Sequence, residues 1–318
     1  MKYKTRLKNK TVRLVVRIAF VTLVIVFFAQ AHAATVQVKQ KSFPSAQEAV
    51  KALVAALKIN DEKELLAIFG TEGAEVISSG DPVADKDRIE RFLKKFEEKN
   101  SLITQKNSVT LILGQDEWPF PIPVVKKGQK WFFDTAKGKE EILNRRIGEN
   151  ELNTIETCLA IVDAQREYAM MDVDRDGILE YAEKIMSDPG KKNGLYWETK
   201  EGEEASPIGP LLAEARKEGY GENKTTDTPA PYHGYYYRFL KGQGKNAAGG
   251  AYEYHVNGRL FGGFALVAYP AKYGNSGVMT FIVNHDGIVY QKDFGKNTAK
   301  SAETMNKFDP DKTWKKVK

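Results

Sequence analysis

The residues best placed to do chemistry form one acidic segment, residues 172–183. Within twelve residues, carboxylates stand at positions 1, 3, 5, 9 and 12, and they belong to Asp172, Asp174, Asp176, Glu180 and Glu183. Gly177 stands at position 6, where an EF-hand calcium loop needs glycine for its sharp turn, and Ile178 at position 7 can offer its backbone carbonyl. Because calcium takes six to eight hard oxygen ligands, this spacing predicts a calcium site.

The same segment also fits an Asx-rich turn that caps the next helix and leaves its charges solvated. That alternative accounts for one or two aspartates but not for five spaced carboxylates. Only Arg175 and Lys184 are nearby in sequence to offset the five negative charges, so an empty compact loop would repel itself. The flanks favour the EF-hand, since a helical pattern arrives at Met171 and a second helix can begin over residues 181–186. Only one such loop is found, so we expect a weak, structural site with a Kd on the order of 0.1–1 mM.

No sequence motif demands an enzyme, and we assign no catalytic residue. Cys158 is the single cysteine, so no intramolecular disulfide can form, and its apolar helical neighbours predict a buried structural thiol. An alternative is a hydrolase whose site is assembled from dispersed residues such as His233, His255 and Asp286. Convergence of these three side chains in one cleft would distinguish the two hypotheses.

The first 33 residues have the three parts of a secretory signal. A cationic stretch precedes twelve residues, Ile18 to Ala29, in which only Thr22 is polar, and Ala31-His32-Ala33 is a small-x-small cleavage signal. An uncleaved membrane anchor is the alternative, but twelve residues rise only about 18 Å as a helix, short of the roughly 30 Å hydrocarbon core. We therefore expect cleavage, a periplasmic or secreted location, and no transmembrane segment in the mature chain.

The charge distribution argues against nucleic-acid binding. The formal charge of the 318-residue chain is +6. Residues 1–33 hold seven of the 48 Lys and Arg residues and no acidic residue, which leaves 41 cations against 42 carboxylates. The rest of the chain is therefore close to neutral, and a general attraction to phosphate backbones is not expected.

Residues 34–148 predict an α+β domain. Apolar residues recur at helical spacing after capping signals at Ser45 and Asp61, Gly70 supplies a stop, and a third helix is expected over residues 85–98. Strands of a small antiparallel sheet are expected over residues 108–113, 120–125 and 131–133. Because proline donates no ladder hydrogen bond, Pro119, Pro121 and Pro123 make the middle strand an edge or an irregular one.

Residues 149–318 predict a long helix packed on an antiparallel β-meander. The helix is expected over residues 151–171, with Leu152, Ile155, Leu159 and Val162 on its buried face. A polar stretch over residues 188–231 with a short helix at 211–217 separates it from the meander. Strands are expected over residues 235–240, 251–256, 260–269, 278–283 and 288–292. Asn257-Gly258 and Asp286-Gly287 are hairpin signals, and the polar tail from Lys300 is expected to be loose.

Tyrosine is concentrated in the predicted meander, where Tyr235, Tyr236 and Tyr237 are consecutive. In a strand these side chains alternate between the two faces. Cross-strand aromatic packing is one interpretation. The other is an aromatic face that stacks on sugar rings or on a protein partner of the cell envelope.

Several segments together resemble a bacterial family of unknown function, domain-of-unknown-function family 2950. They are residues 79–85 (SGDPVAD), 118–123 (WPFPIP), 163–168 (DAQREY), 233–236 (HGYY), 262–268 (GGFALVA) and 279–284 (MTFIVN). The resemblance covers about residues 43–298. It implies an exported protein of Gram-negative bacteria and brings no known activity or catalytic residue.

Weaker similarities concern the two halves separately. The second half is similar to the globular part of pilin-like proteins, although a pilin keeps its hydrophobic helix. The first half is loosely similar to cone-shaped α+β domains of the nuclear-transport-factor type, whose pocket serves many purposes. Fold similarity of this kind does not carry function.

The sequence thus predicts an exported, non-enzymatic binding or envelope-support protein with one structural calcium site. Its metal ligands would be Asp172, Asp174, Asp176, Ile178, Glu180 and Glu183. Its partner would be a protein or glycan of the cell envelope. The alternative is an envelope or peptidoglycan-modifying hydrolase.

Overall fold

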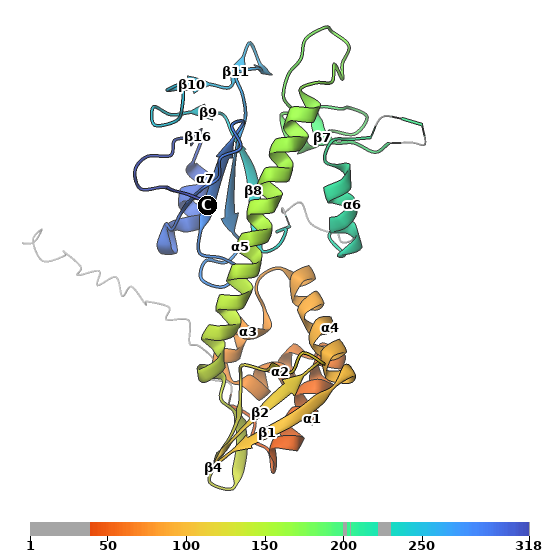
Figure 1. Cartoon of the computed structure of the whole chain (residues 1–318), viewed down its shortest axis with the longest axis vertical. Helices are drawn as coiled ribbons and strands as arrows, with labels where there is room; N and C mark the ends of the chain where they lie inside the picture. Colours follow the sequence, from red (N-terminus) through yellow and green to blue (C-terminus); the bar gives the residue numbers. More distant parts are fainter. Residues whose placement is uncertain (1–38, 200–201, 204, 222–229, 318) are drawn as a thin grey trace, which may run out of the picture. The chain divides into compact units, whose positions relative to one another are not determined.

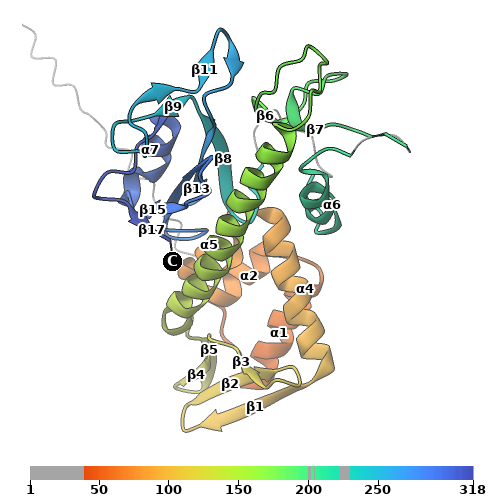
Figure 2. The same ribbon diagram turned by 45° about the horizontal axis from the view of Figure 1, so that its top comes forward.

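The computed structural model describes residues 39–199, 202–203, 205–221 and 230–317, so the predicted leader lies outside the described residues. The described residues all belong to one compact unit. Helices and antiparallel sheets alternate in blocks along the chain (Figures 1 and 2), which confirms the α+β class.

Four helices open the described chain. They are α1 (Ala46–Lys58), α2 (Glu62–Phe69), the short α3 (Ala74–Ile77) and α4 (Pro82–Glu98). The predicted caps are present, since Ser45 and Asp61 accept hydrogen bonds from the Glu48 and Glu64 N–H groups. Helix α4 begins at Pro82 rather than Asp85 because Asp81 caps it.

The first sheet follows directly. Its strands are β1 (Asn100–Gln105), β2 (Ser108–Leu113), β3 (Trp118–Pro119), β4 (Val124–Lys127) and β5 (Lys130–Phe133). The order is β1-β2-β4-β5 with β3 paired to β2, and every pairing is antiparallel. Residues 120–123 carry no strand, so the predicted strand is irregular there and joins the sheet only from Val124, between β2 and β5 rather than at an edge.

Helix α5 (Thr135–Tyr168) is the longest element and starts well before the expected Glu151. Its early buried positions include Thr135, Gly138 and Arg146, so no apolar periodicity marked this stretch as a buried helix. Leu152 and Leu159 were expected to be buried, but they are 64% and 39% exposed. The predicted domain division between residues 148 and 149 falls inside this helix and stays a prediction.

The second half contains a five-stranded sheet. In the order β17-β15-β14-β13-β8, its strands are β17 (Lys315–Lys316), β15 (Tyr290–Lys292), β14 (Thr280–Asn284), β13 (Ala265–Pro270) and β8 (Tyr235–Leu240). All its pairings are antiparallel, and α5 packs on β13 and β14. The predicted meander is therefore present, except that residues 251–256 lie outside this sheet, in β10 (Tyr252–Glu253) and β11 (His255–Val256).

The second half also contains shorter elements. They are β6 (Lys184–Met186), β7 (Gly194–Tyr196), α6 (Gly209–Lys217), β9 (Gly242–Gln243), β10 (Tyr252–Glu253), β11 (His255–Val256), β12 (Arg259–Leu260), α7 (Thr298–Thr304) and β16 (Lys307–Phe308). Asn257 and Gly258 join β11 to β12 with φ of +53° and +83°, as an Asn-Gly hairpin turn requires.

The tail prediction was wrong. From Lys300 the chain continues through α7, β16 and β17. Ala302 is fully buried and Phe308 is 2% exposed. The tail is polar in composition, but its few apolar residues pack into the second core, and their burial was not visible from local sequence.

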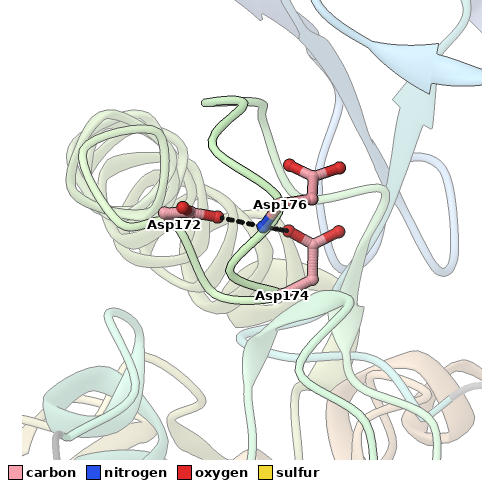
Figure 3. A group of neighbouring side chains, drawn as sticks. All are labelled: Asp172, Asp174 and Asp176. Atoms are coloured by element: carbon pink, nitrogen blue, oxygen red, sulfur yellow. Dashed lines mark hydrogen bonds between the residues drawn. The ribbon is translucent and has the colours of Figure 1, made fainter.

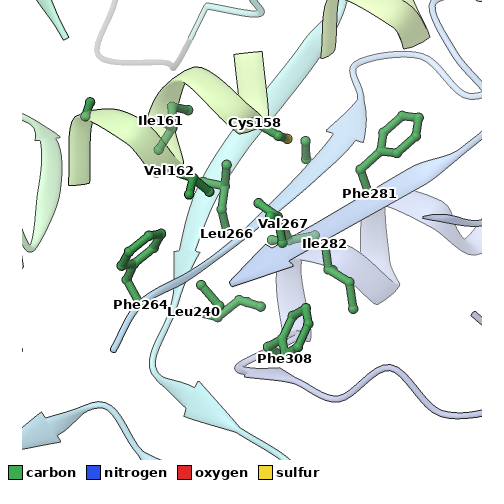
Figure 4. Close-up of a cluster of buried hydrophobic side chains, with 14 of the residues drawn as sticks. Cys158, Ile161, Val162, Leu240, Phe264, Leu266, Val267, Phe281, Ile282 and Phe308 are labelled. Atoms are coloured by element: carbon green, nitrogen blue, oxygen red, sulfur yellow. The ribbon is translucent and has the colours of Figure 1, made fainter. Parts of the chain in front are cut away.

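Two buried cores stabilise the unit. One lies among α1, α2, β2, β4 and β5, and the other lies between α5 and the second sheet. Figure 4 shows the second core, where Cys158, Ile161 and Val162 of α5 face Leu266, Val267 and Ile282 of the sheet. Cys158 is fully buried, and burial raises the pKa of its thiol to about 12, as fits a structural thiol.

Candidate functional site

The acidic segment folds as a tight loop directly after α5. Asp172, Asp174 and Asp176 each bring a carboxylate oxygen within 4.8 Å of the others. The Asp176 and Gly177 N–H groups donate to the Asp172 carboxylate at 3.0 Å. Figure 3 shows that the Asp176 N–H also points to the Asp174 carboxylate, at 3.4 Å. Gly177 has φ of +82°, which explains why a glycine is needed at the turn.

An arginine from a distant hairpin compensates this charge. Arg259 of β12 forms ion pairs with Asp174 at 3.2 Å, with Glu180 at 2.7 Å and with Asp176. The hydrogen bond from Arg259 is the largest cause that lowers the pKa of Asp176. The sequence places only Arg175 and Lys184 near these carboxylates. Arg259 is distant in sequence, so its ion pairs with the loop were not predicted.

The last third of the loop departs from an EF-hand. The predicted helix over residues 181–186 is wrong, since β6 occupies residues 184–186. The Tyr181 N–H donates to the Leu260 carbonyl at 3.0 Å, and Ala182 exchanges two hydrogen bonds with the Gln165 side chain, which hold this segment extended. Glu183 is exposed and does not join the three-aspartate cluster, while Ile178 donates its N–H to Asp176.

The dispersed residues of the hydrolase hypothesis occupy different settings. His233 lines a cavity of about 170 Å³ with Glu218 and Tyr220, and its Nε2 lies 3.6 Å from a Glu218 oxygen. His255 is exposed in β11, and Asp286 accepts a hydrogen bond from Asn284. No hydrogen bond or ion pair among the described residues joins any two of His233, His255 and Asp286.

The consecutive tyrosines are held by packing. Tyr235 is fully buried and donates its hydroxyl to the Met279 carbonyl at 3.0 Å. The ring of Tyr236 packs against Tyr269 on the adjacent strand, with ring centroids 5.6 Å apart. These contacts fit the cross-strand interpretation.

A larger cavity lies beneath α4, and its position and lining were not predicted. Its volume is about 380 Å³, within the range of small-ligand sites. Twelve apolar residues line it, and they are Leu53, Leu57, Leu65, Phe69, Val76, Ile77, Ile89, Phe92, Trp118, Phe120, Pro121 and Ile142. None of the residues of α4, all of them described, is fully buried. Ile89 and Phe92 of α4 are among the residues that line this cavity.

Charged residues line the same cavity. They are the cations Arg88, Arg91, Lys95, Arg145 and Arg146 and the carboxylates Asp85 and Glu149. Arg88, Arg91 and Lys95 recur at helical spacing, and positions three and four apart share a helix face. This recurrence was the sequence pattern that could have indicated the cations of the cavity. That face also carries Phe92, and a cationic stripe beside an apolar one is usually a solvated edge, so the pattern alone did not predict a cavity.

Arg146 is the most unusual of these cations. It is 4% exposed and donates to the carbonyls of Glu75 and Val76 at 2.7 and 2.6 Å and to the Asn275 side chain. Its Nε has no hydrogen-bond partner, and no carboxylate forms an ion pair with it in the described chain. Burial, followed by the charge of Arg88, lowers the pKa of Arg146 to about 10.

The described residues thus form an α+β unit with a lined cavity and an acidic loop. The chain belongs to the family described as protein of unknown function (DUF2950), whose model matches residues 40–317. Searches of curated proteins and of solved structures gave no match. No helix in the described part of the chain is both long enough and apolar enough to cross a membrane.

Proposed function

We propose that this protein is a non-enzymatic binding protein that holds a small apolar ligand in the cavity beneath α4. The observation that carries the proposal is the cavity itself, about 380 Å³ with twelve apolar lining residues, several of which belong to the first core. Apolar cavities of this size with a few polar groups are the usual form of small-molecule sites. The leader at residues 1–33 adds an exported, periplasmic or secreted location to the proposal.

Binding of a neutral dye tests the cavity. The purified chain is titrated with Nile red, and we expect a saturable fluorescence increase with one dye per chain. Ile89→Trp fills the cavity and should weaken binding at least about tenfold, since a large side chain then competes for the same volume. Lys94→Trp adds the same indole at an exposed position of α4 outside the cavity lining and should leave binding unchanged. Equal binding by both variants would contradict the proposal.

A calcium ion in the acidic loop is the second part of the proposed function. Asp172, Asp174 and Asp176 supply convergent hard oxygens, which suit calcium. Glu180 and Asp176 also pair with Arg259, so calcium binding must compete with an internal cation. The bound ion would brace the segment between α5 and β6 and serve no catalytic step.

Calorimetric titration with calcium tests this site. We expect weak saturable binding that Asp174→Ala abolishes, whereas Asp163→Ala, an exposed carboxylate outside the loop, leaves it intact. Arg259→Gln should tighten binding several-fold because it removes the competing cation. Glu183→Ala separates two geometries: an unchanged affinity means that the aspartates hold the ion without an EF-hand closing ligand. Absence of binding at several millimolar calcium in both wild type and Arg259→Gln would contradict the site.

The hydrolase alternative now depends on one residue. Among its three named residues, His233 alone lines a cavity, together with Glu218 and Tyr220. Incubation with purified cell-wall fragments tests it, with release of soluble products as the readout. The binding proposal expects no release, whereas release that His233→Asn abolishes would establish the hydrolase.

A further inference from the structure

We propose that the ligand of the cavity is a single-chain amphipathic carboxylate, with its chain against the apolar wall and its head group at Arg88 and Arg146. This inference rests on the proposed binding function and adds the chemical class of the ligand. It is carried by the charges that line the cavity and by a buried guanidinium without a full set of partners.

The charge that faces the cavity is unbalanced. Five cations line it against two carboxylates, Asp85 and Glu149. Three further carboxylates do pair with these cations, namely Asp87 with Arg91, Asp116 with Lys95, and Glu141 with Arg145. None of those three lines the cavity. Glu149, which does, pairs with both Arg88 and Arg91, so among the described residues Arg146 is the lining cation that no carboxylate pairs with. The interior therefore favours an anion.

Arg88 and Arg146 form the part of this wall best shielded from water. The Arg88 side chain is 21% exposed, and it donates to Asn150 at 2.9 Å and pairs with Asp85 at 3.4 Å. Arg146 is 4% exposed and has only neutral hydrogen-bond partners. The two guanidinium charges repel, and this repulsion adds to burial, the larger cause, in lowering the pKa of Arg146. An anionic head group between them would relieve this repulsion.

The unpartnered Nε of Arg146 is the independent sign of a missing partner. Buried polar atoms in native proteins almost always have one, and a charged group without one costs more than a neutral group. Neighbouring carbonyls satisfy the other two nitrogens of this guanidinium. A small shift of the side chain toward a bound carboxylate would supply the missing acceptor, and bidentate carboxylate binding suits arginine.

The volume of the cavity suits a ligand with a single aliphatic chain. About 380 Å³ is near the lower end of small-ligand sites. Trp118 and Phe120 form an aromatic part of the wall, and Arg145 lies 5.3 Å from the Trp118 ring centroid. Apolar side chains and cations thus line the same cavity, which suits an aliphatic tail with a single anionic head group.

Calorimetric titration of the purified chain with dodecanoate, dodecanol and dodecyltrimethylammonium tests the inference. We expect dodecanoate to bind about ten- to hundredfold more tightly than dodecanol, as charge-assisted hydrogen bonds predict, and the ammonium to bind most weakly. Shortening the acid to decanoate should weaken binding about fifteenfold, at roughly 0.8 kcal/mol per methylene. Arg88→Gln should remove the preference for the acid, and Lys94→Gln, an exposed cation of the same helix outside the lining, should keep it.

Each outcome is informative even if Arg88→Gln does not fold, because the comparison of the three ligands uses the wild-type chain. Dodecanol binding as tightly as dodecanoate would overturn the inference, and Nile red binding would still leave the proposed function standing. An acid preference that Lys94→Gln also abolishes would overturn the assignment to Arg88. Failure of all three ligands and of Nile red would remove both proposals.

Discussion

At the scale of single residues, Asp81 shows how one buried carboxylate serves several elements. It caps α4 by accepting from the Val83 and Ala84 N–H groups. Its other oxygen accepts from the Tyr220 hydroxyl at 2.9 Å and from the Gly234 N–H at 2.8 Å. Four donors satisfy a carboxylate that is 1% exposed, so this cap also fixes segments more than a hundred residues away.

His233 predicts a pH dependence at this same junction. Its ring centroid lies 4.1 Å from that of Tyr232, and burial lowers its pKa below the usual 6.5 against the opposing effect of Asp81. The unfolded chain then binds a proton that the folded chain does not, so the free energy of unfolding falls as pH decreases through about 6.5. We expect this loss between pH 8 and 5.5 in urea titrations.

His233→Asn should reduce that loss. Asparagine is the matched substitution because position 233 has φ of +49°, a region that asparagine tolerates. His255→Asn at an exposed position is the control and should behave as wild type. A His233→Asn variant with an undiminished slope would show that other groups carry the pH dependence.

At the scale of elements, α5 contains two glycines with opposite surroundings. A Cβ added at Gly148 meets no atom within 4 Å, whereas one at Gly138 would lie 2.4 Å from the Pro121 carbonyl oxygen. Gly148→Ala should therefore raise the free energy of unfolding by up to about 1 kcal/mol, because alanine favours the helix. Gly138→Ala should lower it by about 1–3 kcal/mol, since the backbone of the 120–123 segment must move.

Chemical denaturation of the two variants measures the contrast. Each serves as the control of the other, because the substitution and the helix are the same. Stabilisation by Gly138→Ala would mean that the close approach of α5 to Pro121 does not exist in solution.

At the scale of the whole molecule, α5 takes part in both cores. Ile142 packs against the first core, while Cys158, Ile161 and Val162 belong to the second. The Arg146 side chain also donates a hydrogen bond to the Asn275 side chain, and the Asn150 side chain donates one to the Ser276 carbonyl. A shared helix of this kind couples the packing on its two ends.

We therefore expect residues 39–317 to unfold in one cooperative transition. Trp118 and Trp131 report on the first core, and Trp197 and Trp314 on the second. Variants that keep one pair and replace the other by phenylalanine should show coincident midpoints in denaturant. Gly148→Pro interrupts α5 and should separate the two midpoints, because proline removes a hydrogen bond and clashes with the preceding turn. Separate unfolding midpoints of the two cores in a chain whose α5 is unaltered would contradict the single transition. They would support the predicted division between residues 148 and 149.

Much of the local structure followed from the sequence alone. Ser45, Asp61 and Gly70 mark helix ends through their own side chains or backbone freedom, and Asn257-Gly258 specifies its turn in the same way. The acidic loop was also visible, because its aspartates are close in sequence and bond to neighbouring N–H groups. Interactions between residues a few positions apart need no knowledge of the rest of the chain.

The tertiary structure decided the features that depend on distant residues. Arg259 reaches Asp174 across 85 positions, and Arg146 reaches Asn275 across 129. The cavity exists because α4 covers the first core without filling it, which no periodicity reveals. Sequence therefore determined where the chain turns and caps itself, whereas packing determined which charges meet and where space remains. Those outcomes depend on how whole elements pack together. In a close-packed interior, the neighbours of a side chain are set by the packing of the elements and not by the local sequence.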